Sequence, residues 1–263
     1  MTPVRAGRPA SPFPPGGFVA MAHRGGALLR ANRGRENTVH AFTEATRLGY
    51  RHLETDVHTT ADGVLVAFHD TVLDRVTDAT GEIAGLPWAE VRRARVGGQD
   101  PIPTLDELLE TFPEAVLNLD IKAPGAVAPL AETLRRHAAT GRVCVGSFSL
   151  RRLSAFRALA GASVATSATQ LEVVLTRLGL PFAGRGPAVA LQVPVRHRIL
   201  GVDVPVVTRG LVERAHAAGR QVHVWTVDAE DEMHRLVDLG VDGLVSDAID
   251  TLKRVLTARG LWA

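Results

Sequence analysis

Short apolar segments alternate with amphipathic segments along almost the whole chain. The apolar segments predict eight strands, at Phe18–Ala22, His52–Val57, Val116–Ile121, Val143–Phe148, Ser163–Thr166, Ala188–Val193, Val222–Val227 and Gly243–Val245. The intervening segments predict helices over Thr38–Leu48, Leu105–Phe112, Val127–His137, Leu150–Leu159, Leu171–Leu178, Leu211–Ala218, Glu230–Leu239 and Ile249–Thr257. Strands that alternate with helices pair in parallel, and nearly continuous apolar strands are covered on both faces. We therefore expect an α/β fold, a TIM (β/α)8 barrel rather than an open sheet.

The length of the chain agrees with one barrel. A chain of 263 residues with 46% hydrophobic content can bury a large core, so we expect a single domain over residues 18–263. Residues 1–17 hold five prolines with several Gly, Ser and Arg, a composition that cannot offset its ordering entropy and predicts a flexible tail.

One segment, at about residues 64–103, interrupts the alternation. It begins with an extended run at Val64–Asp70 and includes a predicted short helix at Trp88–Arg95. Loops between strand and helix usually have about 2–6 residues, so an excursion of this length is functional or an inserted subdomain. We expect a small insertion after the second strand.

Charge and composition exclude several kinds of partner. The 30 Lys and Arg residues nearly balance the 28 Asp and Glu residues and form no basic block, so we expect no nucleic-acid binding. No apolar run approaches the roughly 20 residues of a membrane span, so stable membrane insertion is not expected. The first residues lack the basic-then-apolar order of a secretory signal, which favours the cytoplasm. The single cysteine, Cys144, has apolar neighbours and is expected to be buried and inert.

The stretch Glu54–Asp70, with the sequence ETDVHTTADGVLVAFHD, concentrates acidic side chains and histidine. Glu54 and Asp56 are two positions apart on a strand, so their side chains point the same way. In a barrel, active groups lie at the C-terminal ends of the strands. Besides Glu54 and Asp56, this rule brings together His23, Arg24, Asp120, Lys122 and Trp225, and His69 if the insertion folds back over the mouth.

These residue types indicate phosphoryl-oxygen chemistry. Glu54, Asp56 and Asp120 form a hard oxygen set that suits Mg²⁺ or Ca²⁺ and not structural zinc. A single carboxylate of this kind is more often a salt-bridge partner or a helix cap, but three at strand ends favour a metal. Imidazole titrates near neutral pH, so histidines at this mouth could serve as acid and base.

Two cations belong to the same group of residues. Arg24 could bind a phosphate with its planar fork and Lys122 as a point charge. Lys122 could instead pair only with Asp120, two residues away on the same strand face.

Several motifs resemble the glycerophosphodiester phosphodiesterase family, in order from about Phe18 to Leu256. They are HRGG at His23–Gly26, ENT at Glu36–Thr38, the stretch Glu54–Asp70, LDRVT at Leu73–Thr77, IPTLDELL at Ile102–Leu109, LNLDIK at Leu117–Lys122, HVWTVD at His223–Asp228 and DGLVSD at Asp242–Asp247. The resemblance implies a TIM barrel with a small insertion after the second strand. It also implies metal-dependent hydrolysis of small-molecule glycerophosphodiesters, such as glycerophosphocholine, to glycerol 3-phosphate and an alcohol.

The resemblance also implies a role for each matching residue. It makes His23 and His69 catalytic, assigns phosphate or substrate binding to Arg24, Lys122 and Trp225, and makes Glu54, Asp56 and Asp120 the ligands of a divalent cation, Mg²⁺ or Ca²⁺. The third ligand is usually glutamate in this family, and Asp120 is shorter. Asp228 and Ser246 stand where the family usually has Asn and Thr. For Glu36–Thr38 a structural role as a helix cap is favoured.

Two alternatives remain open. A lysophospholipase D or sphingomyelinase-D-like activity on single-chain lipids gains from Asp120, because aspartate is normal at the third ligand position in that branch. The complete ENT and HD motifs favour glycerophosphodiesters instead. A binding barrel without activity should lack a histidine or a ligand, and none of them is missing.

Overall fold

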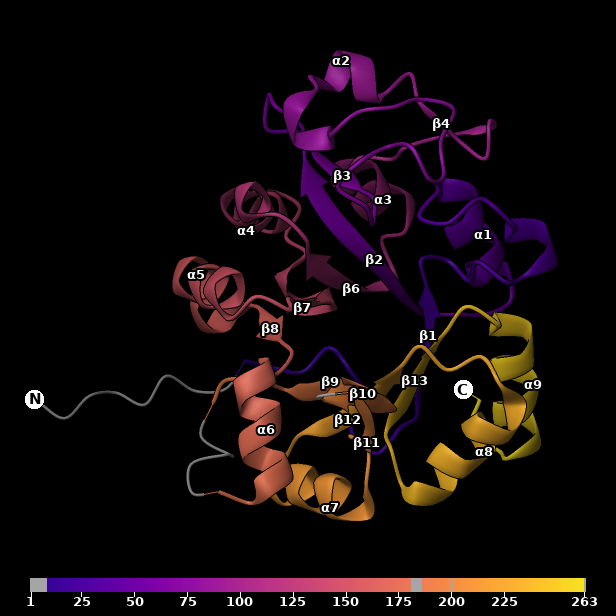
Figure 1. Cartoon of the computed structure of the whole chain (residues 1–263), viewed down its shortest axis with the longest axis vertical. Coiled ribbons are helices and arrows are strands. Elements are labelled where there is room, and N and C mark those ends of the chain that lie inside the picture. Colours follow the sequence, from indigo (N-terminus) through magenta and orange to yellow (C-terminus); the bar gives the residue numbers. More distant parts are fainter. Residues whose placement is uncertain (1–8, 181–185, 200, 263) are drawn as a thin grey trace, which may run out of the picture.

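Eight parallel strands form the centre of the molecule, as predicted. The computed structural model describes residues 9–180, 186–199 and 201–262. The strands are β1 (Val19–His23), β2 (His52–Thr59), β6 (Val116–Ile121), β7 (Val143–Gly146), β8 (Ala165–Thr166), β9 (Ala190–Pro194), β12 (Gln221–Trp225) and β13 (Gly243–Ser246). They are neighbours in the order β8-β7-β6-β2-β1-β13-β12-β9 (Figure 1). A parallel bridge between Ser167 and Ala190 joins the two ends of this order, so the sheet closes into the expected barrel.

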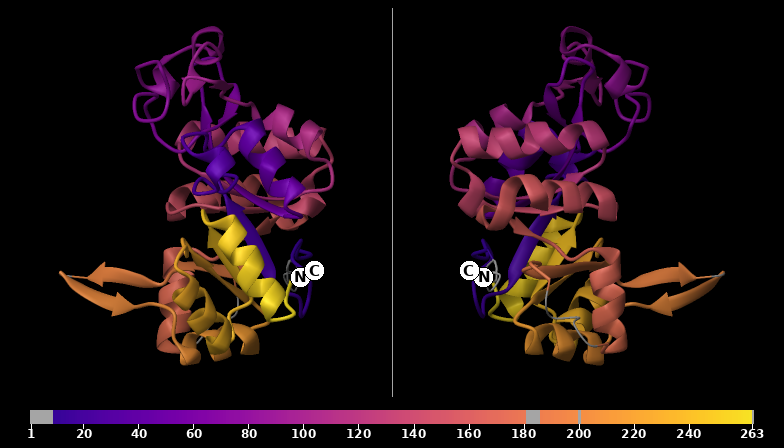
Figure 2. Two further views of the ribbon diagram at one scale, coloured as in Figure 1. Left: turned by 90° about the vertical axis from the view of Figure 1, so that its right-hand side faces the viewer. Right: turned by 90° about the vertical axis from the view of Figure 1, so that its left-hand side faces the viewer.

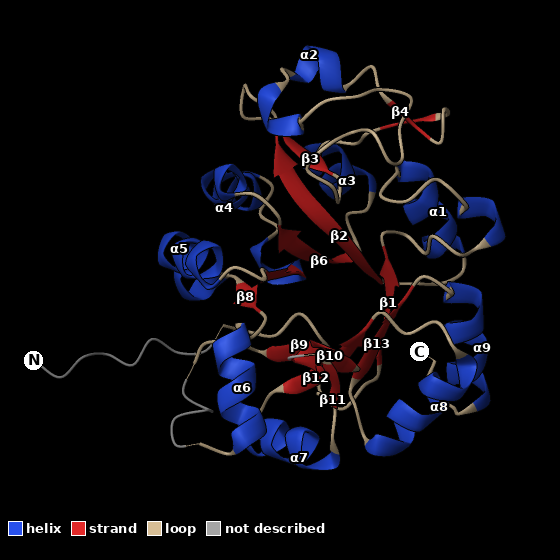
Figure 3. Ribbon diagram, in the orientation of Figure 1, coloured by secondary structure: helices blue, strands red, loops and turns tan. Residues whose placement is uncertain are grey.

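Helices surround the strands (Figure 3). Those of the barrel are α1 (Val39–Arg47), α3 (Leu105–Thr111), α4 (Val127–Arg136), α5 (Leu150–Ala160), α6 (Gln170–Leu178), α7 (Arg209–Ala217), α8 (Glu230–Leu239) and α9 (Ile249–Ala258). The sequence sets where many of them begin, because a Ser or Thr side chain accepts a hydrogen bond from a backbone N–H of the first turn. These N-caps are Thr38, Thr104, Ser149, Thr169 and Thr208. No helix of the described residues is long and apolar enough to cross a membrane.

The insertion between β2 and α3 forms a small body with a core of its own (Figure 1). Its first strand, β3 (Leu65–Ala67), pairs antiparallel with the end of β2, and β4 (Arg95–Val96) pairs with β5 (Asp100–Pro101). The buried apolar side chains of this core are Val66, Phe68, Leu73, Ile83, Val91, Ala94, Val96 and Ile102. The helix predicted over Trp88–Arg95 is shorter, because α2 (Trp88–Val91) ends in tight turns that lead into β4.

A hairpin that the sequence did not predict follows β9. Its strands, β10 (Arg196–Ile199) and β11 (Val202–Pro205), pair antiparallel and project beyond the rest of the molecule (Figure 2). The side chains from Arg196 to Arg198 are exposed, so the strand lacks the apolar run from which the barrel strands were recognised.

Part of the predicted flexible tail packs against the barrel. Residues 1–8 lie outside the described residues, but Phe13 is only 2% exposed. Its ring contacts His223 edge-on, with 4.5 Å between the ring centroids, and it packs with Val19 and Met21 of β1. The Pro14 carbonyl accepts a hydrogen bond from the Gln221 amide. The prediction of a flexible tail over residues 1–17 was wrong for Phe13 and Pro14, because the phenylalanine supplies the apolar area that the surrounding prolines lack.

Candidate active site

The chain turns sharply after β1, where the HRGG motif lies. Gly25 and Gly26 both have a φ of +87°, in the left-handed region that favours glycine. A Cβ atom on Gly25 would lie 2.6 Å from the Cβ of Ala41, and one on Gly26 would lie 2.5 Å from Ile249 Cδ1. The two glycines therefore let the backbone pass against α1 and α9, and this turn sets the positions of the two preceding residues, His23 and Arg24.

A carboxylate holds the ring of His23. Its Nδ1 donates to Asp247 Oδ1 at 3.0 Å, which leaves Nε2 directed to the Glu54 side, 3.8 Å from Oε2. Asp247 is held in turn, because its backbone N–H donates to Asp228 Oδ1 at 2.8 Å. Burial alone would lower the pKa of His23, but Glu54 and Asp247 outweigh it and raise that pKa.

Glu54 and Asp56 lie on one face of β2, as the alternation predicted, and both are almost fully buried. Burial and the neighbouring Asp56 raise the pKa of Glu54 to about 7. Burial also favours a raised pKa for Asp56, but the positive charges of Lys122 and Arg24 have the larger combined effect and lower the pKa of Asp56. The two carboxylates thus differ because the cations contact Asp56 and not Glu54: Lys122 Nζ lies 2.9 Å from Asp56 Oδ1, and Arg24 Nε lies 3.3 Å from Oδ2.

Asp120 lies directly beside Asp56 in the pairing of β2 with β6. Lys122, just past the end of β6, places its ammonium between them, 2.7 Å from Asp120 Oδ2. The sequence left open whether Lys122 pairs with Asp120. The structure shows that Lys122 forms an ion pair with Asp120 and a second one with Asp56. Burial disfavours the charged ammonium, yet the two carboxylates raise the pKa of Lys122.

His69 comes from the insertion and lies beside the end of β2. The Phe68 N–H donates to the Asp56 carbonyl at 3.0 Å, and His58 Nε2 donates to the His69 carbonyl at 3.0 Å. The His69 Nδ1 donates to Asp70 Oδ1 at 2.6 Å. The insertion therefore brings His69 to the same end of the barrel as Asp56.

Trp225, the last residue of β12, lies beside an aromatic residue that the sequence did not single out. Phe148 meets its ring edge-on at a centroid distance of 5.4 Å, and Lys122 Nζ lies 5.5 Å from the centre of the Phe148 ring. Phe148 is 52% exposed, so the pair presents apolar surface next to the ammonium.

The ENT motif combines structural and site contacts. Thr38 caps α1, as expected, by accepting from the Ala41 N–H at 3.1 Å. The other two residues reach further: the Asn37 amide donates to Asp56 Oδ2 at 3.2 Å, and Glu36 Oε1 accepts from Arg24 Nη1 at 3.1 Å. The prediction that this motif acts as a helix cap was therefore incomplete, because two of its residues also contact site residues.

Comparison with known proteins agrees with these motifs. Residues 23–251 match the model of the glycerophosphoryl diester phosphodiesterase family. The chain belongs to this family. It is 42% identical over 254 residues to the probable glycerophosphodiester phosphodiesterase 2 of Mycobacterium tuberculosis, with 94% of each chain covered.

Solved structures of this family have the same fold. A putative glycerophosphoryl diester phosphodiesterase of Silicibacter pomeroyi superposes with a TM-score of 0.77 at 25% identity, over 94% of this chain and 96% of that one. A phosphodiesterase of Oleispira antarctica, solved with the product sn-glycerol-3-phosphate, superposes with a TM-score of 0.75 at 25% identity, over 91% of this chain and 96% of that one.

The carboxylates of this phosphodiesterase-family chain suit a hard cation in their chemistry. Glu54, Asp56 and Asp120 offer only oxygen ligands, and burial together with the neighbouring Asp56 raises the pKa of Glu54 to about 7. Within residues 9–180, 186–199 and 201–262, however, no three His, Cys, Asp or Glu side chains are arranged to hold a metal ion. The Lys122 ammonium contacts two of these carboxylates, Asp56 and Asp120.

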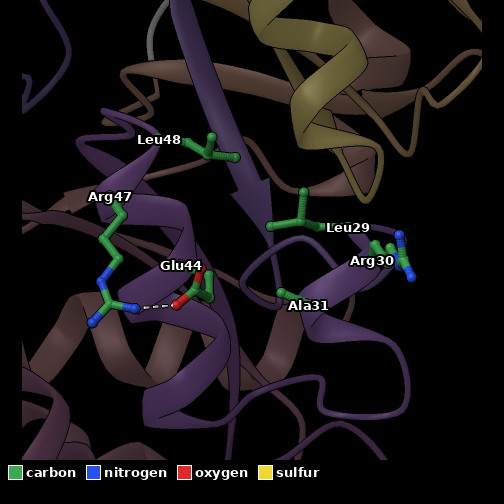
Figure 4. A pocket seen from close by; sticks show the side chains of 6 residues that line it. All are labelled: Leu29, Arg30, Ala31, Glu44, Arg47 and Leu48. Carbon is green, nitrogen blue, oxygen red and sulfur yellow. Dashed lines mark hydrogen bonds and ion pairs between the residues drawn. The ribbon is translucent and has the colours of Figure 1, made fainter.

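A surface hollow between α1 and the preceding 3₁₀ turn (Arg30–Asn32) lies apart from these residues (Figure 4). Its lining consists of Leu29, Arg30, Ala31, Glu44, Arg47 and Leu48. Glu44 and Arg47, one helical turn apart, pair with each other across its edge. None of the lining residues has a role predicted from the family motifs.

Proposed function

We propose that this chain hydrolyses glycerophosphodiesters, such as glycerophosphocholine, to glycerol 3-phosphate and an alcohol. One observation supports this most strongly. His23 and His69 come from different parts of the chain, and each donates its Nδ1 proton to a carboxylate, Asp247 or Asp70. Such a bond fixes the tautomer and leaves Nε2 of each ring for proton transfer. Hydrolysis of a phosphodiester needs one group that takes up a proton and another that gives one.

In this proposal one histidine removes the proton from the nucleophile, which is water or the neighbouring hydroxyl of the glycerol. If the hydroxyl attacks, the first product is a cyclic phosphodiester, and a water molecule then opens it to give glycerol 3-phosphate. The other histidine donates a proton to the oxygen of the departing alcohol, so that the alcohol leaves uncharged. Arg24 and Lys122 bind the non-bridging oxygens of the phosphate and stabilise the charge that develops there. Trp225, with Phe148, forms an apolar wall beside the phosphate.

In this proposal Glu54, Asp56 and Asp120 hold the divalent cation, which requires the Lys122 ammonium to move away from Asp56 and Asp120. When bound, Mg²⁺ or Ca²⁺ supplies Lewis-acid polarisation of a phosphoryl oxygen. The donor set does not distinguish these two ions, since both prefer carboxylate oxygen. The sn-glycerol-3-phosphate bound in the Oleispira antarctica structure supports a small glycerophosphate substrate.

The experiment is turnover of glycerophosphocholine by His23→Ala and His69→Ala, with circular dichroism to check folding. Loss of a general acid or base costs about 10²–10⁴-fold, and we expect both variants to fall in that range. His197→Ala is the control, because this histidine is exposed on the β10–β11 hairpin and should leave turnover unchanged. Near-native turnover in either test variant would contradict the assignment.

Two further measurements complete the test. EDTA should abolish turnover and Mg²⁺ or Ca²⁺ should restore it, and turnover that is indifferent to EDTA would exclude the cation. Faster hydrolysis of lysophosphatidylcholine than of glycerophosphocholine would favour the lysophospholipase D activity instead.

A further inference from the structure

Arg75 of the insertion binds two carboxylates that belong to different parts of the molecule. Its Nε donates to Asp70 Oδ2 at 2.5 Å, and its Nη2 to Asp70 Oδ1 at 3.2 Å. The same guanidinium donates to Glu36, from Nη2 to Oε1 at 2.7 Å and from Nη1 to Oε2 at 3.2 Å. Asp70 precedes it in the insertion, whereas Glu36 lies in the loop between β1 and α1. Arg75 therefore ties the insertion to the barrel.

Glu36 also contacts the other side of the site. Its Oε1 accepts from Arg24 Nη1 at 3.1 Å as well as from Arg75. The contacts form one series of alternating charge, from Arg24 through Glu36, Arg75 and Asp70 to the ring of His69. The series thus connects the group proposed to bind phosphate with one proposed to transfer a proton.

We propose that Arg75 and Glu36 are positioning residues, which hold the His69 ring and the Arg24 guanidinium in a fixed relation by docking the insertion on the barrel. The proposal rests on the function proposed above, because it assigns these two residues a task in the same reaction. Neither residue touches the reacting atoms in this view; each acts through Arg24, Asp70 or His69.

The geometry of Arg75 suits this task. A guanidinium presents several N–H donors in a planar fork, so one side chain can bind two carboxylates at fixed angles, which an ammonium cannot do. Both oxygens of Asp70 are engaged, and the hydrogen bonds from Arg75 lower the pKa of Asp70 to about 2, with a further contribution from His69. Asp70 thus has no freedom to turn away from the His69 Nδ1.

Exposure makes the proposal testable without unfolding the insertion. The Arg75 side chain is 48% exposed, and it is not part of the apolar core of the insertion. Its removal therefore leaves that core intact. Arg93 is an exposed arginine of the same insertion and serves as the matched control.

The kinetic experiment compares Arg75→Met, Arg75→Lys, Glu36→Gln and Arg93→Met on glycerophosphocholine, each checked by thermal melting. Misplacement of a catalytic group by about 1 Å costs on the order of 10²-fold, so kcat of Arg75→Met should fall by about 10–10²-fold with KM nearly unchanged. Arg75→Lys should recover part of the loss, and Arg93→Met should match the unsubstituted protein. In the double variant Arg75→Met/Glu36→Gln, the fold-decrease in kcat should be smaller than the product of the fold-decreases of the two single variants, because both residues act in one series of contacts. Full kcat in Arg75→Met, or independent losses in the double variant, would overturn the proposal.

A spectroscopic readout separates this proposal from the proposed function. The ring ¹⁵N signals of His69, assigned by their loss in His69→Gln, should show the Nδ1-protonated tautomer in the unsubstituted protein. They should show a mixture of tautomers in Arg75→Met and an unchanged ring in Arg93→Met. Unchanged His69 signals in Arg75→Met would refute the positioning role whether or not the protein cleaves phosphodiesters. Absence of all turnover in the unsubstituted protein would instead refute the proposed function and leave the ¹⁵N result to decide the role of Arg75.

Discussion

His223 offers a test of the packing at the N-terminal end of the barrel. It is fully buried in contact with Phe13, and within the described residues its Nδ1 has no hydrogen-bond partner. Burial, with a smaller effect of His52, lowers the pKa of His223 to about 3. The folded protein therefore binds fewer protons than the unfolded chain between the ordinary value of 6.5 and about pH 3. The free energy of unfolding must decrease as the pH falls through this range.

The magnitude follows from the same values. About pH 4.5 lies two units below the ordinary histidine value and above the folded pKa, so His223 stays neutral in the folded protein while the unfolded chain is protonated. Each unit is worth about 1.36 kcal/mol, which gives a loss of about 2.7 kcal/mol from this residue alone. His52, whose pKa burial lowers to about 4, adds to the loss.

The assay is urea unfolding of the unsubstituted protein and His223→Gln at about pH 7.5 and pH 4.5. Glutamine does not titrate, so the stability lost on substitution should be smaller at the acid pH by about 2–3 kcal/mol. His197→Gln, at an exposed position of the β10–β11 hairpin, is the control substitution. An equal effect of His223→Gln at both pH values would refute the reasoning, since it would mean that His223 is protonated or hydrated in the folded state.

Three other substitutions or reactions test the fold. Phe13→Ala should lower the free energy of unfolding by about 3–5 kcal/mol in urea, because it removes a buried ring; an unchanged midpoint would mean that residues 9–17 do not pack as described. Gly26→Ala should cost about 2–4 kcal/mol by the same assay, since the new Cβ meets Ile249 and the φ is strained; a neutral effect would contradict the close approach. Cys144, fully buried with a pKa that burial raises to about 12, should react with a thiol reagent only after unfolding, and rapid labelling of the folded protein would show that it is accessible.

The barrel could be predicted because its strands carry a local signal. The segment Val143–Gly146 is buried along its whole length and holds only apolar residues and glycine, so the pattern stands out. The β10 strand, with exposed Arg196, His197 and Arg198, carries no such signal. The burial of Phe13 was not predicted for a related reason. A single buried ring among prolines makes a tertiary contact, and it produces no repeating pattern in the sequence.

The candidate site was predictable in its residue types and only partly in its contacts. Strand ends and motifs identified His23 and His69, and the HD motif includes Asp70, but they did not identify the carboxylate that orients His23, because Asp247 is 224 residues away along the chain. A signal for it existed in the DGLVSD motif, which ends at Asp247 just past the last barrel strand. The link from Arg75 to Glu36 spans 39 residues and depends on how the insertion docks, which local sequence does not encode.

The charges at the barrel mouth explain why Glu54 differs from the other carboxylates. Asp56 and Asp120 share Lys122, and Asp56 also contacts Arg24, so these two anions are largely compensated. Glu54 is the third anion and accepts a hydrogen bond from the Arg24 N–H, which carries no net charge. Burial and the neighbouring Asp56 raise the pKa of Glu54 to about 7, although His23, whose Nε2 lies 3.8 Å from Glu54 Oε2, and the two cations act against this rise. A divalent cation that contacts both Glu54 and Asp56 would reduce the repulsion between these two buried carboxylates, and this repulsion is the physical argument for a cation at this site.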